Sequence, residues 1–254
     1  MKAILRNLCR QILDRESRGH LGGEWSTNLH DQFEILPAGT QGATVSNMWD
    51  LTDAGTTATP VVAFATDGGG LTLTTSAGDD DATSLWSLST GAWSVPRKAD
   101  GTRKHRLSSK VKTGASIASV AIQWGLKLTD TPVYKTDADQ ALIVFDTDAV
   151  DVDPASGYAD ISAGMTTFYV IASVAGSEYV YNTGVTVAAA TEYDFAIEIG
   201  TDKVLNVFIN GKQVALPGLP VLTSTASLLP MFSVSTRTTA TKTATIRQMT
   251  YLGK

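Results

Sequence analysis

The amino-acid sequence predicts an all-β protein, in which two antiparallel sheets pack as a sandwich and a short helical arm precedes them. From Asn47 onward almost every segment has the pattern of a short strand bounded by Gly, Asp, Asn or Pro, and β-branched residues are abundant. Apolar residues recur at helical spacing only in the first eighteen residues. At 254 residues the chain is long enough to bury a full core within one all-β domain.

The N-terminal segment predicts one amphipathic helix that ends near Gly19, because the sequence that follows, LGGEWSTN, favours turns. The apolar stripe of this helix consists of Ile4, Leu5, Leu8, Ile12 and Leu13, with Arg6 and Arg10 on another face. A helix this short is unstable alone in water, so the stripe needs a cover, either the chain's own sandwich or a neighbouring subunit. We therefore divide the chain into a helical arm with a flexible joint, residues 1–34, and a sandwich domain, residues 35–254.

The predicted strands are short apolar or alternating segments that end at turn residues. They lie at Pro60–Phe64, Gly70–Thr75, Ser84–Ser89, His105–Lys112, Ser119–Leu128, Gln140–Asp146, Thr166–Ser173, Tyr193–Gly200, Val204–Asn210, Met231–Ser235 and Thr243–Leu252. The alternation is clearest between residues 193 and 199, which predicts a strand with one buried and one wet face. Asn210 and Gly211 supply the two positive-φ residues of a tight hairpin.

Charge and cysteine content exclude several classes of function. The formal net charge is −5 and the sequence pI is about 5.2, so no general field attracts nucleic acid. The single cysteine, Cys9, excludes an intrachain disulfide and a cysteine-based zinc site, which fits synthesis in a reducing cytoplasm. Arg6 and Arg10 interrupt the N-terminal apolar residues, so we expect neither a signal peptide nor a membrane span.

A group of segments between about residues 65 and 254 carries a family resemblance. These segments are GGGLTLTTSAGDDDATSLWS, RKHRLSSKVKT with the following ASVAIQWGLKLTD, TEYDFAIEIGTDKVLNVFINGKQV, and LLPMFSVSTRTTATKTATIRQMTYLG. Together they resemble the concanavalin A-like lectin and glucanase superfamily, particularly the jelly rolls of tailed-phage virion proteins. Tyr193-Asp194, Asn210-Gly211 and Pro230 match its landmarks. The resemblance implies a two-sheet jelly roll, which relatives use for glycan binding, for hydrolysis or as a virion building block.

The sharpest catalytic candidates are Glu192, Asp194 and Glu198. Laminarinase-type relatives place Glu-x-Asp-x-Glu on a strand in the cleft, whereas this chain has Glu-x-Asp-x-x-x-Glu. On a strand, the Cα atoms of Glu192 and Glu198 would lie about 20 Å apart. That spacing exceeds what a glycosidase pair bridges, since its carboxyls are roughly 5 to 9.5 Å apart. We therefore predict solvent-facing acidic side chains, no catalytic residues and no enzymatic activity.

Two aspartate runs offer oxygen ligands of the kind that calcium prefers. One run is Asp79 to Asp81, and the stronger candidates are Asp146, Asp148, Asp151 and Asp153. Neither run matches a specific calcium-loop motif. We predict that both are polar turns whose carboxylates accept hydrogen bonds from local backbone donors, with no cofactor, and we keep calcium at the second run as the alternative.

A local basic segment and several tryptophans are candidates for partner contacts. The basic residues are Arg97, Lys98, Arg103, Lys104 and Arg106, around an Asp-Gly turn. They form either a docking patch for an acidic surface or a solvated hairpin tip that discourages edge pairing. Trp25 and Trp93 lie in turn-rich sequence and are candidates for stacking on sugars, whereas we assign Trp86 and Trp124 to the core.

These observations favour a structural virion protein of a tailed bacteriophage, namely a capsid decoration or cement protein on the outer capsid surface. Its expected partners are the major capsid protein or other virion subunits, and its expected assembly is a homotrimer by analogy with the family. The alternative is a carbohydrate-binding or host-receptor-binding module of a tail or fibre. The third hypothesis is a glucanase-type hydrolase, which would need two facing carboxylates in an open cleft.

Overall fold

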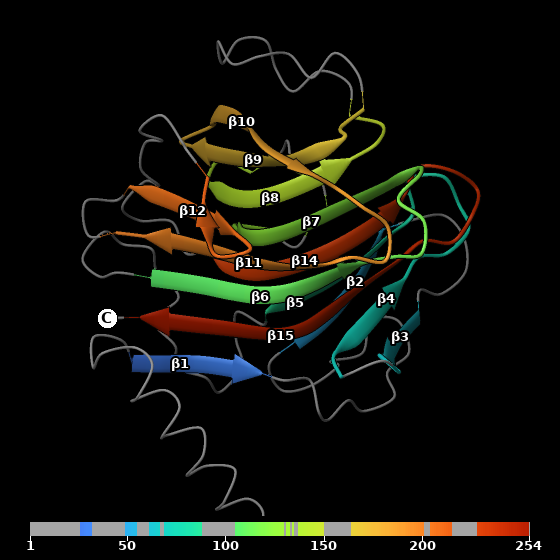
Figure 1. Cartoon of the computed structure of the whole chain (residues 1–254), viewed down its shortest axis with the longest axis horizontal. Coiled ribbons are helices and arrows are strands. Elements are labelled where there is room, and N and C mark those ends of the chain that lie inside the picture. Colours follow the sequence, from blue (N-terminus) through green and yellow to red (C-terminus); the bar gives the residue numbers. More distant parts are fainter. Residues whose placement is uncertain are drawn as a thin grey trace, which may run out of the picture.

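A computed structural model shows a β-sandwich (Figure 1). It describes residues 26–31, 49–54, 61–66, 69–87, 105–129, 131–132, 134, 137–149, 164–200, 204–214 and 228–253. Every strand pairing is antiparallel. The two-sheet antiparallel sandwich predicted from the strand patterns is therefore confirmed. In this part of the chain, no helix is long and apolar enough to cross a membrane.

The first sheet, sheet A, has eight strands in the described part of the chain and lies in front in Figure 1. Its order is β13-β12-β11-β6-β15-β4-β3, and β1 pairs with β15 outside this path. The strands are β13 (Lys212–Gln213), β12 (Leu205–Ile209), β11 (Glu192–Ile199), β6 (His105–Thr113), β15 (Thr243–Gly253), β4 (Leu71–Thr74), β3 (Val61–Phe64) and β1 (Ser26–Asp31). β4 and β1 share the same edge of the long strand β15, one at each end.

The second sheet, sheet B, has seven described strands in the order β10-β9-β8-β7-β14-β5-β2. They are β10 (Ser177–Thr186), β9 (Thr167–Val174), β8 (Gln140–Asp146), β7 (Val120–Lys127), β14 (Leu229–Thr236), β5 (Ala82–Ser87) and β2 (Trp49–Ala54). All residues of β5, β7, β8 and β14 are buried. Both faces of the central part of sheet B are therefore covered, unlike the half-exposed sheet A.

Four strands were not among those predicted, namely β1, β2, β10 and β13. β1 lies within residues 1–34, which we had assigned to an arm and a joint, and it pairs with β15 over residues 249–253. The sandwich therefore begins before residue 35. The predicted N-terminal helix itself lies outside the described residues.

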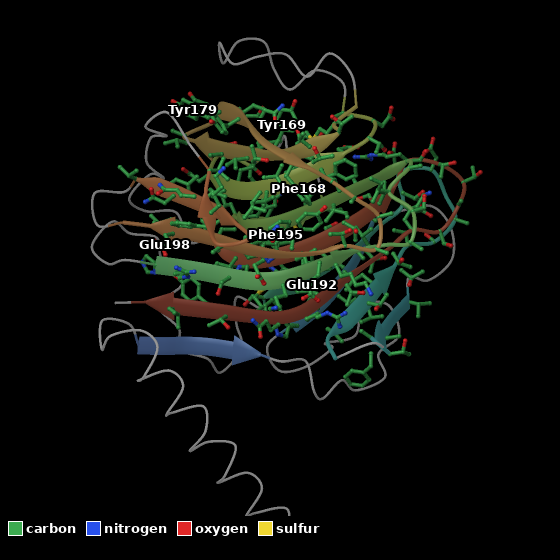
Figure 2. All side chains as sticks on the ribbon, viewed as in Figure 1. Phe168, Tyr169, Tyr179, Glu192, Phe195 and Glu198 are labelled. Carbon is green, nitrogen blue, oxygen red and sulfur yellow. The ribbon has the colours of Figure 1, made fainter. Side chains whose placement is uncertain are left out.

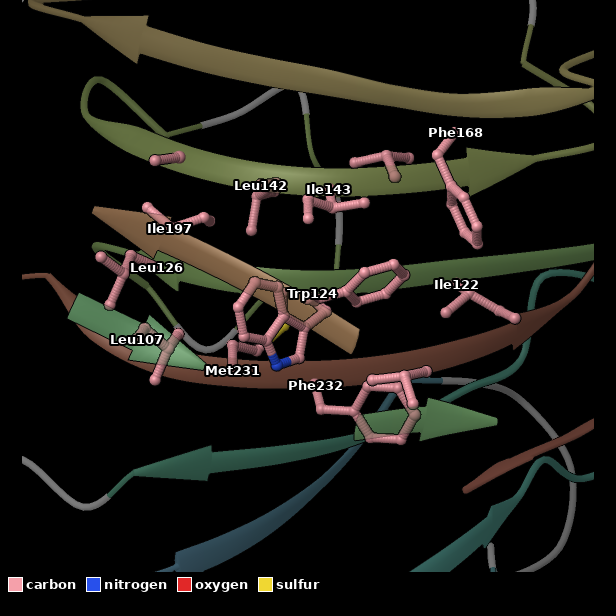
Figure 3. Close-up of a cluster of buried hydrophobic side chains, with 14 of the residues drawn as sticks. Leu107, Ile122, Trp124, Leu126, Leu142, Ile143, Phe168, Ile197, Met231 and Phe232 are labelled. Carbon is pink, nitrogen blue, oxygen red and sulfur yellow. The ribbon is translucent and has the colours of Figure 1, made fainter. Parts of the chain in front are cut away.

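The core lies between the two sheets and is rich in aromatic rings (Figure 3). Trp124 of β7 in sheet B packs on Phe195 of β11 in sheet A, with ring centroids 5.5 Å apart. Phe168 of β9 meets Tyr193 and Phe195 edge-on, at 4.9 and 5.0 Å. The predicted core positions of Trp86 and Trp124 are confirmed, since both are buried. Because the strands alternate faces, the even-numbered residues of β7 near Trp124 face sheet A and Gln123 faces away from it.

The predicted hairpin at Asn210-Gly211 is confirmed. Both residues have positive φ, 53° and 72°, and they join β12 to β13. The Asn210 side chain also accepts a hydrogen bond of 2.9 Å from the backbone N–H of Asp194. The turn residue therefore anchors the hairpin to the neighbouring strand β11.

Candidate functional site

The outer face of sheet A carries a ladder of opposite charges between β6 and β11. The antiparallel register places Lys112 opposite Glu192, Lys110 opposite Asp194, and Arg106 opposite Glu198. Lys110 Nζ lies 3.5 Å from carboxylate oxygens of both Glu192 and Asp194. Cross-strand pairs of this kind stabilise a sheet modestly when they are exposed. The acidic side chains of β11 are therefore partners of the adjacent basic strand.

Glu192 is also paired with Arg247 of β15, the strand beyond β6. The Arg247 Nε–H donates to Glu192 Oε2, and Arg247 Nη1 donates to the carbonyl of Gly69 at 3.0 Å. Partial burial acts to raise the pKa of Glu192, but the hydrogen bond and charge of Arg247, and then Lys110, outweigh it and lower that pKa below 4.5. The Glu192 carboxylate is therefore held ionised, which is the opposite of a general acid.

Glu198 lies toward the other end of β11 from Glu192 (Figure 2). It forms an ion pair with Arg106, whose guanidinium also lies 5.8 Å from the centre of the Phe208 ring. We had grouped Arg106 with a basic loop for partner docking, but it lies in β6 and its charge is paired within sheet A. Glu192, Asp194 and Glu198 thus lie along one strand, each beside a cation.

The face of sheet B that is turned away from sheet A is covered by the segment between β7 and β8. Gln123 Nε2 donates to the carbonyl of Pro132 at 2.7 Å, and Lys127 Nζ donates to that of Thr131 at 2.7 Å. Gln140 Nε2 donates to Ser173 Oγ at 3.0 Å and also to the Tyr134 carbonyl. The segment is therefore tied to the sheet by side chains from the strands that flank it.

Asp137 organises the start of this segment. Its Oδ2 accepts hydrogen bonds from the backbone N–H groups of Leu128 and Thr129, both at 2.9 Å, and lies 3.8 Å from Lys127 Nζ. Its Oδ1 accepts a bond of 2.6 Å from the Thr129 hydroxyl. Lys127 and Asp137 are both fully buried. This arrangement holds a loop in place and leaves neither charge facing a substrate.

Asp146 is the centre of a second buried network, at the end of β8. Its two oxygens accept from Arg237 Nε at 3.0 Å and Arg237 Nη2 at 2.6 Å. Oδ1 also accepts from the backbone N–H of Asp148 at 3.0 Å, and Oδ2 accepts from the Tyr134 hydroxyl at 3.1 Å. Burial and the neighbouring Asp146 raise the pKa of Tyr134, so its hydroxyl stays protonated and donates.

Both carboxylate oxygens of Asp146, one of the calcium candidates, thus accept hydrogen bonds from Arg237. The exposed Asp148 contributes a backbone N–H at this turn, as expected of a polar turn. At the other aspartate run, Asp81 Oδ2 accepts from the Ser76 hydroxyl and from the Gly78 N–H, the latter at 2.9 Å. No three His, Cys, Asp or Glu side chains within the described ranges are grouped to hold a metal ion.

Several predicted contact residues lie outside the described residues. They are Ile4, Leu5, Arg6, Leu8, Arg10, Ile12 and Leu13 of the arm, Arg97, Lys98, Arg103 and Lys104 of the basic loop, Trp25 and Trp93, and Asp151 and Asp153. The partner roles assigned to them remain predictions.

No protein-family model matches the sequence, and no curated protein matches it. Solved structures do resemble the fold. A protein of unknown function from Shewanella oneidensis MR-1, SO2946, has a TM-score of 0.61 at 11% identity, with 89% of this chain and 85% of that chain covered. The potassium-bound carbohydrate recognition domain of Emp46p has a TM-score of 0.57 at 9% identity, over 89% and 97% of the two chains.

The chain has the lectin-like jelly-roll fold. The alginate lyase AlgAT5 of polysaccharide lyase family 7 has it too, with a TM-score of 0.50 at 11% identity over 76% of this chain and 82% of that one. The same fold thus serves a carbohydrate recognition domain and a lyase, and fold alone does not decide function. Function therefore has to be inferred from the side chains described above.

Proposed function

We propose that this protein is a non-enzymatic structural protein of a tailed-phage virion, a decoration or cement subunit that binds the outer capsid surface. The observation that carries the non-enzymatic part is the charge ladder on sheet A, where each candidate acid of β11 has a basic partner. An active glycosidase pair needs two carboxyls facing one another across a substrate. The virion assignment rests on the sequence resemblance between residues 65 and 254.

The proposed contacts with the capsid come from the N-terminal arm. Its apolar stripe needs burial, and a capsid surface or a neighbouring subunit would provide it. We propose a homotrimer by analogy with the family, with no metal, cofactor or nucleic acid. Synthesis in the host cytoplasm fits the single cysteine.

Co-sedimentation with shells of the encoding phage, prepared without this protein, tests the proposal. We expect the full-length chain to sediment with the shells and Leu8→Glu/Ile12→Glu to remain in the supernatant. Asp194→Asn, at an exposed position of the ladder, is the control and should bind as the wild type does. Failure of the wild-type chain to bind, or equal binding by the arm variant, would sink this proposal.

A second candidate is a carbohydrate-binding or host-receptor-binding module of a tail or fibre. The observation in its favour is the fold itself, which the carbohydrate recognition domain of Emp46p shares. Binding of the wild-type chain to a glycan array, together with no binding to the shells, would favour this candidate over the capsid proposal.

A hydrolase is the least favoured function. Incubation with soluble β-glucans should release no reducing sugar. If reducing sugar were released, loss of that activity in Glu192→Gln would place the site at the acids of β11, and unchanged activity would exclude them.

A further inference from the structure

One edge strand of sheet A, β3, carries neither the charges nor the bulges that commonly keep sheet edges from pairing. β3 pairs with β4 on one side, and no described strand pairs with its other side. Two of its four residues are large apolar residues with exposed surface, Val61 at 56% and Phe64 at 47%. In Figure 1 this strand lies beyond β4, at the lower right of the sheet. An apolar, exposed edge is a template for pairing with another strand.

The other described edges carry the usual protection. β13 has only two residues, Lys212 and Gln213, and both are exposed. β10 has an irregular register between Asn182 and Thr186, and β1 has one between Thr27 and Leu29. β2 contains Asp50 and Asp53 in its sequence. Short strands, bulges and charges of this kind discourage edge-to-edge pairing. β3 is also short, at four residues, but it carries no charge and no register shift.

The charge pattern favours a second copy of β3 as the partner over a charged surface. No charged residue occurs between Asp53 and Asp67, so the strand and its flanks are neutral. A neutral strand offers no attraction to a charged partner surface, and two copies of it meet without like charges opposite one another. Two copies of β2 would bring aspartates together, and this would add repulsion between chains that each carry a net charge of −5.

The hydrogen bonds within the sheet show which residues of β3 face the open edge. The Ala65 N–H donates to the Gly70 carbonyl at 2.9 Å, and Ala63 lies opposite Thr72. In an antiparallel ladder the backbone groups of alternate residues point the same way, so those of Ala63 point toward β4. Those of Val62 and Phe64 therefore point away from β4, at the open edge.

We propose that β3 pairs with β3 of a second copy of this chain, antiparallel about a two-fold axis at Ala63, so that sheet A continues across a dimer. In this register Val62 lies opposite Phe64 of the second copy, and both N–H and C=O groups of each residue are bonded. The register also leaves Pro60, which has no N–H to donate, outside the bonded pairs. Ala63 lies opposite its own copy, and the outer faces of the two sheets are continuous.

Analytical ultracentrifugation of the full-length chain over a concentration series tests the dimer. We expect the wild type to dimerise reversibly, and Ala63→Lys and Ala63→Glu each to weaken dimerisation by roughly tenfold or more through like charges at the axis. An equimolar mixture of Ala63→Lys and Ala63→Glu should restore it, since opposite charges then meet. Ser177→Lys, at an exposed position on the edge strand β10, is the matched control and should dimerise as the wild type does.

Hydrogen exchange provides a readout on the unmodified chain. The amides of Val62 and Phe64 should gain protection as concentration rises, while those of Lys212 and Gln213 at the opposite end of sheet A should not. A wild type that stays monomeric at all concentrations, or a mixture of the two variants that fails to recover, would overturn the proposal. The β3 contact predicts a species of two chains and the analogy with the family predicts one of three, so the sedimentation series separates the two proposals. A species of three chains that Ala63→Lys leaves unchanged would overturn the β3 contact and keep the trimer.

Discussion

Arg237 and Asp146 form a bidentate ion pair that joins the end of β14 to the end of β8. The two residues are 91 positions apart in sequence, and their side chains retain 18% and 2% of their surface. Burial acts to lower the pKa of Arg237, but Asp146 and then Asp80 outweigh it and raise that pKa, so the guanidinium remains charged. The pair holds the turn after β14 against the end of the neighbouring strands.

Removing one partner of this pair should lower the free energy of unfolding. Arg237→Met would leave the buried Asp146 carboxylate without its main cation, and we expect the free energy of unfolding to fall by about 3 kcal/mol. Arg106→Met is the matched control, because its pair with Glu198 is partly exposed and should cost less than about 1 kcal/mol. Urea denaturation of the three proteins measures both values. Equal losses would show that burial of the Arg237 pair does not matter.

Glu192 should make stability depend on pH in the acidic range. Its pKa is lower in the folded chain than the ordinary 4.5, so its contribution is fully present above 4.5 and is lost as the pH falls through the folded-state value. Because the side chain is 36% exposed, solvent screens the pair and we expect only about 0.5 kcal/mol at pH about 7. The stability difference between wild type and Glu192→Gln should shrink on acidification to about pH 3. A difference that stays constant with pH would contradict this assignment.

The strands that the sequence predicts best are those whose pattern reflects burial. The predicted bounds of β8, Gln140–Asp146, are those of the structure, because this short apolar run is covered on both faces. β10 was missed because it is an edge strand, in which Gly184 and several polar residues interrupt the alternation. β2 was missed because two aspartates lie in a six-residue strand. Edge strands show a weaker alternation of apolar and polar residues, because only part of each strand is buried.

The partners of the candidate acids could not be predicted in the same way. Nothing in the segment around Asp146 indicates Arg237, and the pairing of Glu198 with Arg106 depends on the register of strands 92 positions apart. The spacing of Glu192 and Glu198 did indicate that they would not face each other, because strand geometry alone sets that distance. Long-range register is a property of the folded sheets, and a single sequence does not encode it in any local pattern.

Phe195 should be among the most sensitive positions of the core. Its ring contacts Trp124 and Phe168 of sheet B and stacks beside Tyr193 of its own strand. We expect Phe195→Ala to lower the free energy of unfolding by about 3 to 5 kcal/mol, since it leaves a cavity between the sheets. Phe208→Ala, on the half-exposed outer face of sheet A, should cost much less. Similar losses at the two positions would mean that the aromatic cluster does not hold the sheets together.

Gly70 allows β15 to pass close to the start of β4. We therefore expect a single methyl group added at this position to destabilise the fold strongly. A Cβ atom at Gly70 would lie 2.4 Å from the Ile246 carbonyl oxygen and 2.5 Å from Arg247 Cα, at a φ of +98°. The register of β15 shifts at this point, between Ile246 and Gln248. Because both contacts are backbone atoms, neither can move without shifting β15.

We expect Gly70→Ala to destabilise the fold by more than about 3 kcal/mol, through the clash and the left-handed backbone together. Gly176→Ala is the matched control, since its φ is +82° and a Cβ there would meet nothing within 4 Å. The control should lose only about 1 kcal/mol, the cost of the backbone conformation. Thermal and urea unfolding of the two variants measure the difference. If both variants lose the same amount, the close approach of β15 to Gly70 contributes nothing to stability.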